Sequence, residues 1–286
     1  MIEELYQPKV MTYKEYLRVL KEHTPYDFSE YSDNSINRRI QKVMQDHKMT
    51  FDELTARTLS DNRFVEEVVE AITVNTTDFF RDPELWRFLF EKHLSIYRKN
   101  GVINIWHAGC STGQEVFSLL ILFNELGMLP KTRVFATDIS QKALDKAKEG
   151  IYKHQIERGC IDNFSKVFND PKKGEQILDK YFDVDSMNDI ITVKPLLKKN
   201  IKFIRHDLVK NGLPFYNKMD IVFCRNVLIY FNAKLQTRII QRFFDVLFSN
   251  GTLVLGAHES LNGFFKTKFE KTGPVFKKSN GFHFRC

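Results

Sequence analysis

The segment AGCSTGQE, residues 108–115, follows a short apolar run and precedes an amphipathic stretch, so it reads as a turn from a strand into a helix. Its small residues let a ligand approach the backbone, and a helix N-terminus offers free N–H groups to a ligand carboxylate. Glu115 adds a negative charge suited to a ligand ammonium group. The segment lacks both GxxxxGK[ST] and GxGxxG, which disfavours nucleoside triphosphates and dinucleotides.

A second acid stands where the next strand ends. Asp138 closes the run FATD, and an acid at this place is positioned to accept hydrogen bonds from ribose hydroxyls. Either feature alone is equally well read as an ordinary strand-to-helix turn with a capping acid. Together, in this order, they favour an adenosine-containing ligand such as S-adenosylmethionine.

Two further segments carry candidate chemistry. In CRNVLIYF, residues 224–231, Arg225 and Asn226 follow a predicted strand and face the expected cleft, and Tyr230 offers a phenol. The Asn/Asp-Pro-Pro-Tyr motif typical of N-methyltransferases is absent here. In TVNTTDFFRD, residues 73–82, Arg81 requires an anionic partner or solvent, whereas the two phenylalanines have an equally good interpretation as core.

The elements that would position these residues change character along the chain. Apolar spacings of three and four predict four helices between residues 11 and 73, with Ser32 or Asn34 and Thr50 as caps. From about residue 100, β-branched runs alternate with amphipathic helices, which predicts a parallel sheet covered on both faces. The predicted strands are 102–106, 133–137, 201–204, 220–224 and 252–256, and the predicted helices are 114–126, 140–149 and 233–248.

Two stretches depart from this alternation. Residues 151–200 read as an insertion with a helical part and a few short strands. Near the end, Asn280-Gly281 lies between apolar runs at 275–276 and 282–284, which predicts a closing hairpin and antiparallel strands at the end of the sheet.

The charge is unevenly divided. The formal net charge is +7, but residues 1–90 hold 12 Lys+Arg against 17 Asp+Glu, whereas the remainder holds 31 against 19. The net charges of −5 and +12 suggest two units with different roles. A basic excess invites a nucleic-acid methyltransferase reading, but no appended nucleic-acid module supports it.

Other classes are disfavoured by what is missing. No apolar run is long enough to span a membrane, and MIEELYQPKV does not resemble a secretory signal. Histidines and cysteines lack metal-ligand spacing, so we expect no metal site. The cysteines, which form no CxxC pair and indicate a reducing cytoplasm, are Cys110, Cys160, Cys224 and Cys286.

The motifs NTTDFFRD, AGCSTGQE, ATDIS, residues 203–208 and CRNVLIYF, in this order, resemble the chemotaxis receptor glutamate O-methyltransferases, the CheR family. The resemblance covers nearly the whole chain. It implies an α/β fold: a class I (Rossmann-like) methyltransferase sheet with a small all-helical N-terminal domain and an inserted small antiparallel β subdomain. We expect a substrate-recognition domain at 1–90 and an S-adenosylmethionine-binding domain at 91–286, with the insertion at about 151–200.

The resemblance also implies the activity. Methyl groups would pass from S-adenosyl-L-methionine to glutamate side chains of chemoreceptors (methyl-accepting chemotaxis proteins), leaving S-adenosyl-L-homocysteine. It assigns to the cofactor Asn75, Thr77, Arg81, Gly109, Glu115, Asp138, Asp207, Leu208, Arg225 and Asn226. Arg81 and Tyr230 would flank the transferred methyl group as catalytic residues. The chain departs from the family pattern at Gln114, usually an acid, and at Asp207, often Asn.

The substrate side is expected in the first unit. Arg38, Arg39 and Lys42 form a basic cluster in an otherwise acidic region. On the sequence alone a solvated helix face is the favoured explanation, but the resemblance implies that this helix faces the cytoplasmic helical domain of a chemoreceptor. We expect a monomer without nucleic-acid binding or membrane insertion. The acidic stretch 183–189 lacks the glycine of tether-binding relatives, which predicts tether-independent substrate binding. The rival hypothesis is a non-catalytic S-adenosylmethionine-binding signalling regulator.

Overall fold

The computed structural model describes residues 11–73, 76–153, 158–170, 172–210 and 212–279. By its contacts the chain divides into two compact units. The helical unit comprises the chain up to residue 74 together with Tyr230–Leu235, and the sheet unit comprises the rest.

The helical unit contains four helices where the sequence predicts them. They are α1 (Tyr13–His23), α2 (Asp33–His47), α3 (Phe51–Ser60) and α4 (Asn62–Thr73). Thr12 and Thr50 cap α1 and α3 in capping boxes, and Ser32 caps α2, which confirms two of the predicted caps. The apolar faces of these helices supply the buried core of this unit, including Tyr16, Ile40 and Phe64, each fully buried.

One distant segment joins the helical unit. The Ser32 amide donates to the Tyr230 carbonyl at 2.8 Å, and the Asn232 amide donates to the Glu30 carbonyl at 3.0 Å. The rings of Tyr31 and Phe231 meet edge to face at 4.9 Å. Residues 230–235 therefore complete a fold whose other residues all lie at or before residue 74.

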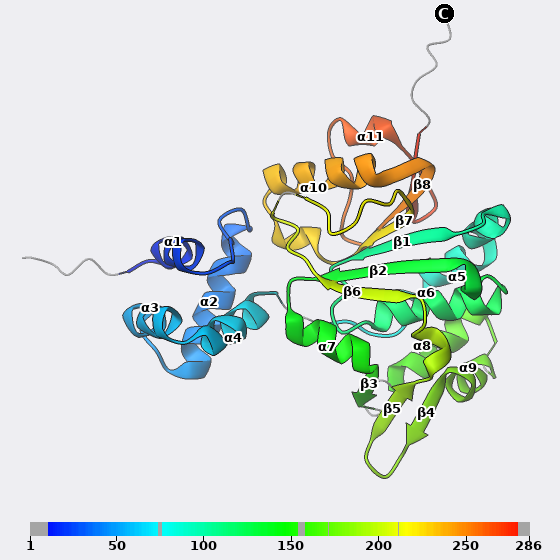
Figure 1. Ribbon diagram of the computed structural model, residues 1–286, viewed down its shortest axis with the longest axis horizontal. Helices are drawn as coiled ribbons and strands as arrows, with labels where there is room; N and C mark the ends of the chain where they lie inside the picture. Colours follow the sequence, from blue (N-terminus) through cyan, green and yellow to red (C-terminus); the bar gives the residue numbers. More distant parts are fainter. Residues whose placement is uncertain (1–10, 74–75, 154–157, 171, 211, 280–286) are drawn as a thin grey trace, which may run out of the picture. The chain divides into compact units, whose positions relative to one another are not determined.

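The sheet unit is built on a seven-stranded sheet in the order β6-β2-β1-β7-β8-β10-β9. Its strands are β1 (Ile103–Ala108), β2 (Thr132–Asp138), β6 (Ile201–Arg205), β7 (Met219–Cys224), β8 (Leu247–Leu255), β9 (Phe269–Thr272) and β10 (Val275–Lys278). Strands β1, β2, β6, β7 and β8 run parallel, and β10 pairs antiparallel with β8 and β9. Figure 1 shows β6, β2, β1 and β7 side by side in this order.

The predicted alternation of strands and helices is confirmed. The helices that connect the parallel strands are α6 (Gln114–Glu125), α7 (Gln141–Glu149) and α10 (Ala233–Val246). Shorter helical elements are α5 (Pro83–Phe88), η1 (Leu89–His93), η2 (Leu94–Lys99), η3 (Leu129–Lys131), η4 (Pro195–Leu197), η5 (Leu228–Tyr230) and α11 (Phe265–Lys268). Parallel strands bring their carboxyl ends to one edge, and the candidate loops after β1, β2 and β7 all begin there.

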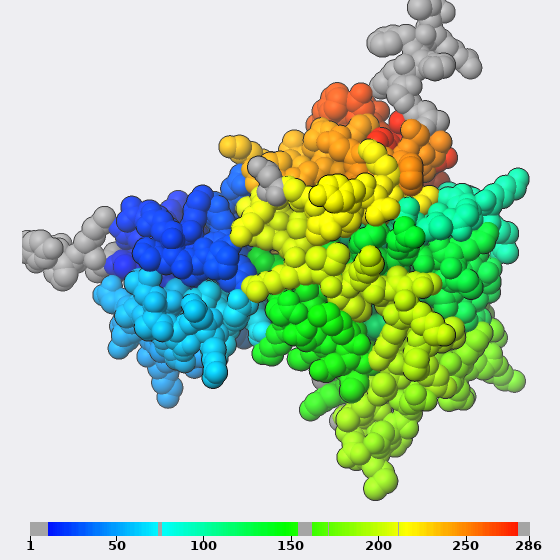
Figure 2. Space-filling view, viewed as in Figure 1, coloured from blue at the N-terminus to red at the C-terminus, as the bar shows by residue number. Residues whose placement is uncertain are grey.

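The expected insertion forms a small separate sheet. Its strands are β3 (Ile151–Lys153), β4 (Phe182–Asp185) and β5 (Ile190–Val193), antiparallel in the order β3-β5-β4, and two helices precede β4, α8 (Arg158–Phe168) and α9 (Lys173–Tyr181). In Figure 2 the turn between β4 and β5 forms a protruding tip at the lower edge.

Two details differ from the sequence-based expectations. The helical unit ends at residue 74, before the boundary expected near 90, because Phe79, Phe80 and Trp86 are fully buried in the core of the sheet unit. The final hairpin turns at Gly273, which has φ +59°. The Asn280-Gly281 turn predicted for it lies outside the described residues. Within the described part of the chain, no helix is long and apolar enough to cross a membrane.

Candidate active site

The loop after β1 has the close-packed backbone that its small residues predict. Gly109 and Gly113 have φ of +85° and +93°, where side chains are disfavoured. A Cβ at Gly109 would lie 2.5 Å from Cγ2 of Val227, in the loop after β7. The Gly109 and Cys110 amides donate to the Thr137 carbonyl at 2.8 and 2.9 Å. Glycine at 109 therefore lets the loops of neighbouring strands meet.

Asp138 joins the loop after β1 to the end of β2. Its Oδ2 accepts from the Ser111 amide at 2.8 Å, and its Oδ1 accepts from the Ser140 amide at 3.0 Å. Burial raises the pKa of this carboxyl above its usual value, although the backbone hydrogen bonds oppose the shift. A buried carboxylate held in this way is stabilised by further donors, and ribose hydroxyls are donors of that kind.

Glu115, at the start of α6, lies in a buried polar network. Its Oε1 is 3.0 Å from Nδ1 of His107, and its Oε2 is 3.0 Å from Nη1 of Arg225. Burial raises the pKa of Glu115, but the hydrogen bond from His107 and the pairing with Arg225 together leave it below its usual value. Glu115 is therefore ionised at neutral pH.

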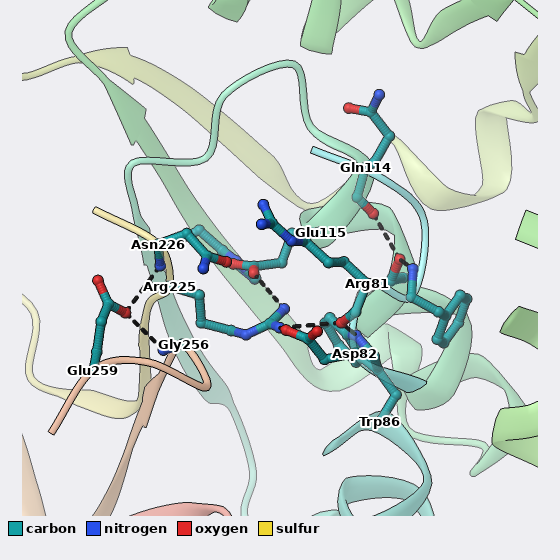
Figure 3. A network of polar contacts seen from close by, with 12 residues as sticks. Arg81, Asp82, Trp86, Gln114, Glu115, Arg225, Asn226, Gly256 and Glu259 are labelled. Carbon is teal, nitrogen blue, oxygen red and sulfur yellow. Dashed lines mark hydrogen bonds and ion pairs between the residues drawn. The ribbon is translucent and has the colours of Figure 1, made fainter. Parts of the chain in front are cut away.

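Arg225 connects Glu115 to the segment that carries Arg81. Its side chain is 2% exposed, and its Nη2 lies 2.6 Å from Oδ2 of Asp82 and 3.0 Å from the Arg81 carbonyl oxygen. The same carbonyl accepts Nε1–H of Trp86 at 2.9 Å. Figure 3 shows Arg225 between Glu115 and Asp82. Arg225 thus makes its visible bonds to protein groups, a role that the assignment to the cofactor did not include.

The segment before α5 is held in an unusual conformation. Phe80 and Asp82 have φ of +51° and +61°, which is costly for residues other than glycine. The Phe80 amide donates to Oγ of Ser118 at 2.9 Å, and Ser118 donates to the Gln114 carbonyl at 2.8 Å. Phe79 and Phe80 are fully buried in the hydrophobic core, which confirms the interpretation of these two residues as core.

Arg81 has a side chain available for a ligand. It is half-buried, and its Nη1 has one long hydrogen bond, 3.5 Å to the Thr76 carbonyl. No carboxylate within the described ranges forms an ion pair with it. Its backbone is fixed by Arg225 and Trp86 while its guanidinium keeps most of its donors.

Glu259 is a site residue that sequence reasoning missed. It follows β8 and accepts backbone hydrogen bonds from the loop after β7, among them Asn226 at 2.9 Å and Leu228 at 2.7 Å. The available signal was its position, since an acid placed shortly after a parallel strand lies at the ligand-binding edge. His107, Asp82 and Trp86 were also missed. Asp82 pairs with Arg225 at a separation of 143 positions, which no local pattern reveals.

The remaining predicted residues are distributed as follows. Asp207 and Leu208 follow β6, the Asp207 Oδ1 accepts from the Val209 amide at 2.9 Å, and Leu208 is buried. Thr77 is half-buried in the segment before α5, and Asn75 lies outside the described residues. Tyr230 belongs to the helical unit by its contacts, so its place beside a transferred methyl group stays a prediction.

The basic cluster lies on α2 in the helical unit. Arg38 and Lys42 are exposed and lie one helical turn apart, whereas Arg39 is half-buried. Its role towards a substrate stays a prediction.

The residues at the carboxyl edge of the sheet fit S-adenosylmethionine. Ser111 has a buried Oγ without a hydrogen-bond partner within the described residues, and this hydroxyl lies in the loop expected to meet the ligand carboxylate. The glycine backbone leaves no Cβ at 109, and Asp138 and Glu115 are carboxylates whose chemistry suits ribose hydroxyls and an ammonium group.

No group of histidine, cysteine and acidic side chains in the described ranges could hold a metal ion. Cys110 and Cys224 are buried free thiols, and burial raises the pKa of both. Neither is suited to act as a nucleophile.

Comparison with known proteins identifies the family of both parts of the chain. Residues 75–275 match the family model described as CheR methyltransferase, SAM binding domain, and residues 11–73 match the CheR methyltransferase all-alpha domain. A Pseudomonas putida protein provisionally named methyltransferase Cher3 is 34% identical over 89% of this chain and 92% of its own length. The chemotaxis protein methyltransferase Cher2 of the same organism is 32% identical over 80% and 82%.

Among solved structures, magnesium protoporphyrin IX methyltransferase of Synechocystis PCC 6803 with bound SAM is 13% identical over 69% of this chain and 76% of its own. Its TM-score of 0.35 is too low to carry an argument. The two family models, matched in order over most of the sequence, decide the assignment: the chain belongs to the CheR methyltransferase family, and its cofactor is S-adenosylmethionine.

Proposed function

We propose that this protein transfers methyl groups from S-adenosylmethionine to glutamate side-chain carboxylates of chemoreceptors, giving glutamyl methyl esters for sensory adaptation. The observation that carries the proposal is the polar network from Glu115 through the buried Arg225 to Asp82, which connects the candidate cofactor loop to the segment of Arg81. Relatives named chemotaxis protein methyltransferase support the choice of substrate.

The reaction demands little acid–base chemistry of the protein. A glutamate has an ordinary pKa near 4.3 and is already a carboxylate at neutral pH, so no general base is needed. S-adenosylmethionine supplies an activated methyl group when it is bound. The protein's task is to align the carboxylate oxygen and to exclude water.

Arg81 is the residue we assign to the substrate carboxylate. Its half-buried guanidinium has no acidic partner within the described residues, so its charge is available to orient an anion. Strong neutralisation would reduce the reactivity of the carboxylate, so positioning is the more effective role. Tyr230 is proposed to contribute its phenol on the other side of the methyl group.

The cofactor would be held by residues at the carboxyl edge of the sheet. Glu115 would take the ammonium end, Asp138 the ribose, and the backbone around Gly109 and Ser111 the carboxylate. Asn75, Thr77, Asp207, Leu208 and Asn226 are proposed as the remaining contacts.

The substrate surface is proposed to be α2. Arg38 and Lys42 are exposed on this helix and would attract acidic helices of a chemoreceptor's cytoplasmic domain. Because its proposed substrate is a cytoplasmic domain, we propose that the protein acts in the cytoplasm; a monomeric state is part of the same proposal.

Methyl transfer to a chemoreceptor cytoplasmic fragment tests the proposal. The fragment is compared with a version whose candidate glutamates are changed to glutamine, and incorporation should be lost in the latter. The Arg81→Ala variant should bind S-adenosylhomocysteine normally but transfer methyl groups at least about a hundredfold more slowly, since it loses a positioning group. A protein that binds the cofactor without labelling any receptor fragment would instead be the non-catalytic regulator.

A further inference from the structure

Glu259 is a strongly bonded carboxylate to which the proposed reaction gives no role. It lies in the loop after β8 and accepts backbone N–H groups from two loops. Its donors are the amides of Asn226, Val227, Leu228, Ile229 and Gly256, at 2.9, 2.9, 2.7, 3.3 and 2.7 Å respectively. Hydrogen bonds to an ionised acceptor are among the stronger ones in proteins.

The two loops that Glu259 joins leave neighbouring parallel strands. Cys224, the last residue of β7, pairs with Leu255, the last residue of β8, so both loops start at the same edge of the sheet. Four consecutive amides of the first loop turn towards one carboxylate, as in the anion-binding concavities that successive N–H groups form. The carboxylate therefore fixes the backbone path of residues 226–229.

Gly256 shows how closely the junction is packed. A Cβ there would lie 2.8 Å from Oε2 of Glu259 and 2.9 Å from the Asn226 nitrogen. Because a real Cβ is essentially never found at such distances from other atoms, the residue at 256 must be glycine for this contact to form. Figure 3 shows Glu259 bonded to Asn226 and Gly256 beside the Glu115–Arg225 network.

Asn226 is the residue that this arrangement orients. Its φ of +59° lies in the left-handed region, which asparagine tolerates better than most residues. Its backbone amide is held by Glu259, whereas no hydrogen bond of its side-chain amide to the described residues is present. Asn226 therefore has a fixed backbone and a side chain available to a ligand.

We propose that Glu259 is a positioning residue for the cofactor: it holds the loop 226–229, and Asn226 with it, in the geometry that meets S-adenosylmethionine, without touching the cofactor itself. This inference rests on the proposed function, which assigns Asn226 to the cofactor. The inference adds Glu259, which lies in the loop after β8, to the residues that shape the cofactor site.

Glu259→Gln tests the inference with little change of shape. The amide –NH2 replaces one acceptor oxygen and must face N–H donors, so the loop should lose part of its anchorage. We expect the dissociation constant for S-adenosylhomocysteine, measured by calorimetry, to rise about tenfold or more, since several charge-assisted hydrogen bonds are lost. The KM for S-adenosylmethionine should rise by a similar factor, with a smaller change in kcat. The matched control is Glu270→Gln, an exposed glutamate on β9, which should leave the affinity unchanged.

A second comparison separates positioning from general stability. Leu253→Ala removes a fully buried side chain of β8 and should lower Tm while leaving cofactor affinity near wild type. If Glu259→Gln lowers Tm but binds S-adenosylhomocysteine as wild type does, Glu259 is merely structural and the inference is overturned. Should that variant fail to fold, Glu259→Asp keeps the charge on a shorter side chain, and wild-type affinity in it would overturn the inference equally.

The readout does not depend on the methyl acceptor. Cofactor affinity is measured without any receptor, so failure of chemoreceptor methylation would leave the Glu259 result valid. Asn226→Ala tests the underlying assignment separately: unchanged affinity in this variant would remove Asn226 from the cofactor site and contradict the positioning role assigned to Glu259.

Discussion

Arg225 Nη1 lies 3.0 Å from Glu115 Oε2, and this contact joins the carboxyl end of β7 to the first turn of α6. The other guanidinium nitrogen reaches Asp82 at 2.6 Å. One buried cation thus connects the residue assigned to the cofactor ammonium with the segment of Arg81. The guanidinium carbon also lies 5.7 Å from the centroid of the Trp86 ring, a further favourable contact.

Removing this cation should be strongly destabilising. Arg225→Ala would leave Glu115 buried with only His107 as a partner, and the loss of one member of a buried pair costs about 3–5 kcal/mol. Asp82 is 43% exposed and should add little. Urea unfolding followed by tryptophan fluorescence measures the change, because Trp86 and Trp106 are fully buried. The exposed Arg98→Ala is the control, and a loss below about 1 kcal/mol for Arg225→Ala would contradict the role of the network.

Buried His93 should make stability depend on pH. It is 4% exposed, and its Nε2 lies 2.8 Å from Oγ1 of Thr252. Burial, aided by the charge of Lys277, lowers the pKa of His93 from 6.5 to about 4. Because the folded pKa is the lower one, the unfolded state binds more protons between these values. The stabilising contribution is complete above pH 6.5 and is lost as the pH falls through 4.

The size of this effect is measurable. The free energy of unfolding at pH 5 should be about 2 kcal/mol lower than at pH 7.5, because the His93 pKa differs between the folded and unfolded states. Urea titrations at both pH values compare wild type with His93→Gln, in which the pH dependence should shrink by about that amount. His258→Gln, at an exposed histidine of the same unit, should behave as wild type. If the free energy of unfolding of His93→Gln depends on pH as strongly as that of the wild type, groups other than His93 govern the sensitivity to acid.

These results show what the sequence could predict. The alternation of strands and helices identified the sheet, because each parallel strand is a short apolar run with a polar loop at its carboxyl end. Gly109, Glu115 and Asp138 could be proposed as cofactor residues from the sequence, because each lies at the carboxyl end of a predicted strand or in the loop and first helical turn that follow it. Thr50 with Glu53 likewise predicted a helix start, since the capping box is a local interaction.

The parts that escaped prediction depend on long-range contacts. Glu259 bonds to residues some 30 positions away, and Asp82 pairs with Arg225 across 143 positions, so no local pattern revealed either. The helical unit ends before the boundary predicted near residue 90 for the same reason. Phe79 and Phe80 precede α5 in sequence but pack into the core of the sheet unit. Residues 230–235 could not be assigned to the helical unit from the sequence, because the motif CRNVLIYF at 224–231 reads as a single loop after a strand.

Charge reversal on α2 should weaken substrate binding. The double variant Arg38→Glu, Lys42→Glu presents an acidic face to an acidic receptor helix, so the KM for the receptor should rise about tenfold at low salt, with kcat unchanged. The effect should diminish as ionic strength rises. Arg63→Glu on α4 changes an exposed cation of the same unit and serves as the control. Equal effects from both variants would indicate a non-specific response to net charge.

The β4–β5 turn should not bind a receptor tail. Asp183 and Asp185 are exposed on β4, and Met187 at the tip is 97% exposed. This hairpin therefore presents acidic groups, and residues 183–189 contain no glycine. Calorimetric titration with a receptor-tail pentapeptide should give no binding in the micromolar range. A parallel titration with S-adenosylhomocysteine confirms that the sample is active. Micromolar affinity for the pentapeptide would refute tether-independent recognition.

The chemical nature of the product tests the central claim most directly. The protein is incubated with tritiated S-adenosylmethionine and chemoreceptor-containing membranes, and the labelled receptor is then treated with base. A glutamyl methyl ester is base-labile, so the account predicts that the label is released as methanol and that Arg81→Ala gives little label. Label that stays on the receptor in base would indicate methylation of nitrogen or carbon and would contradict the account.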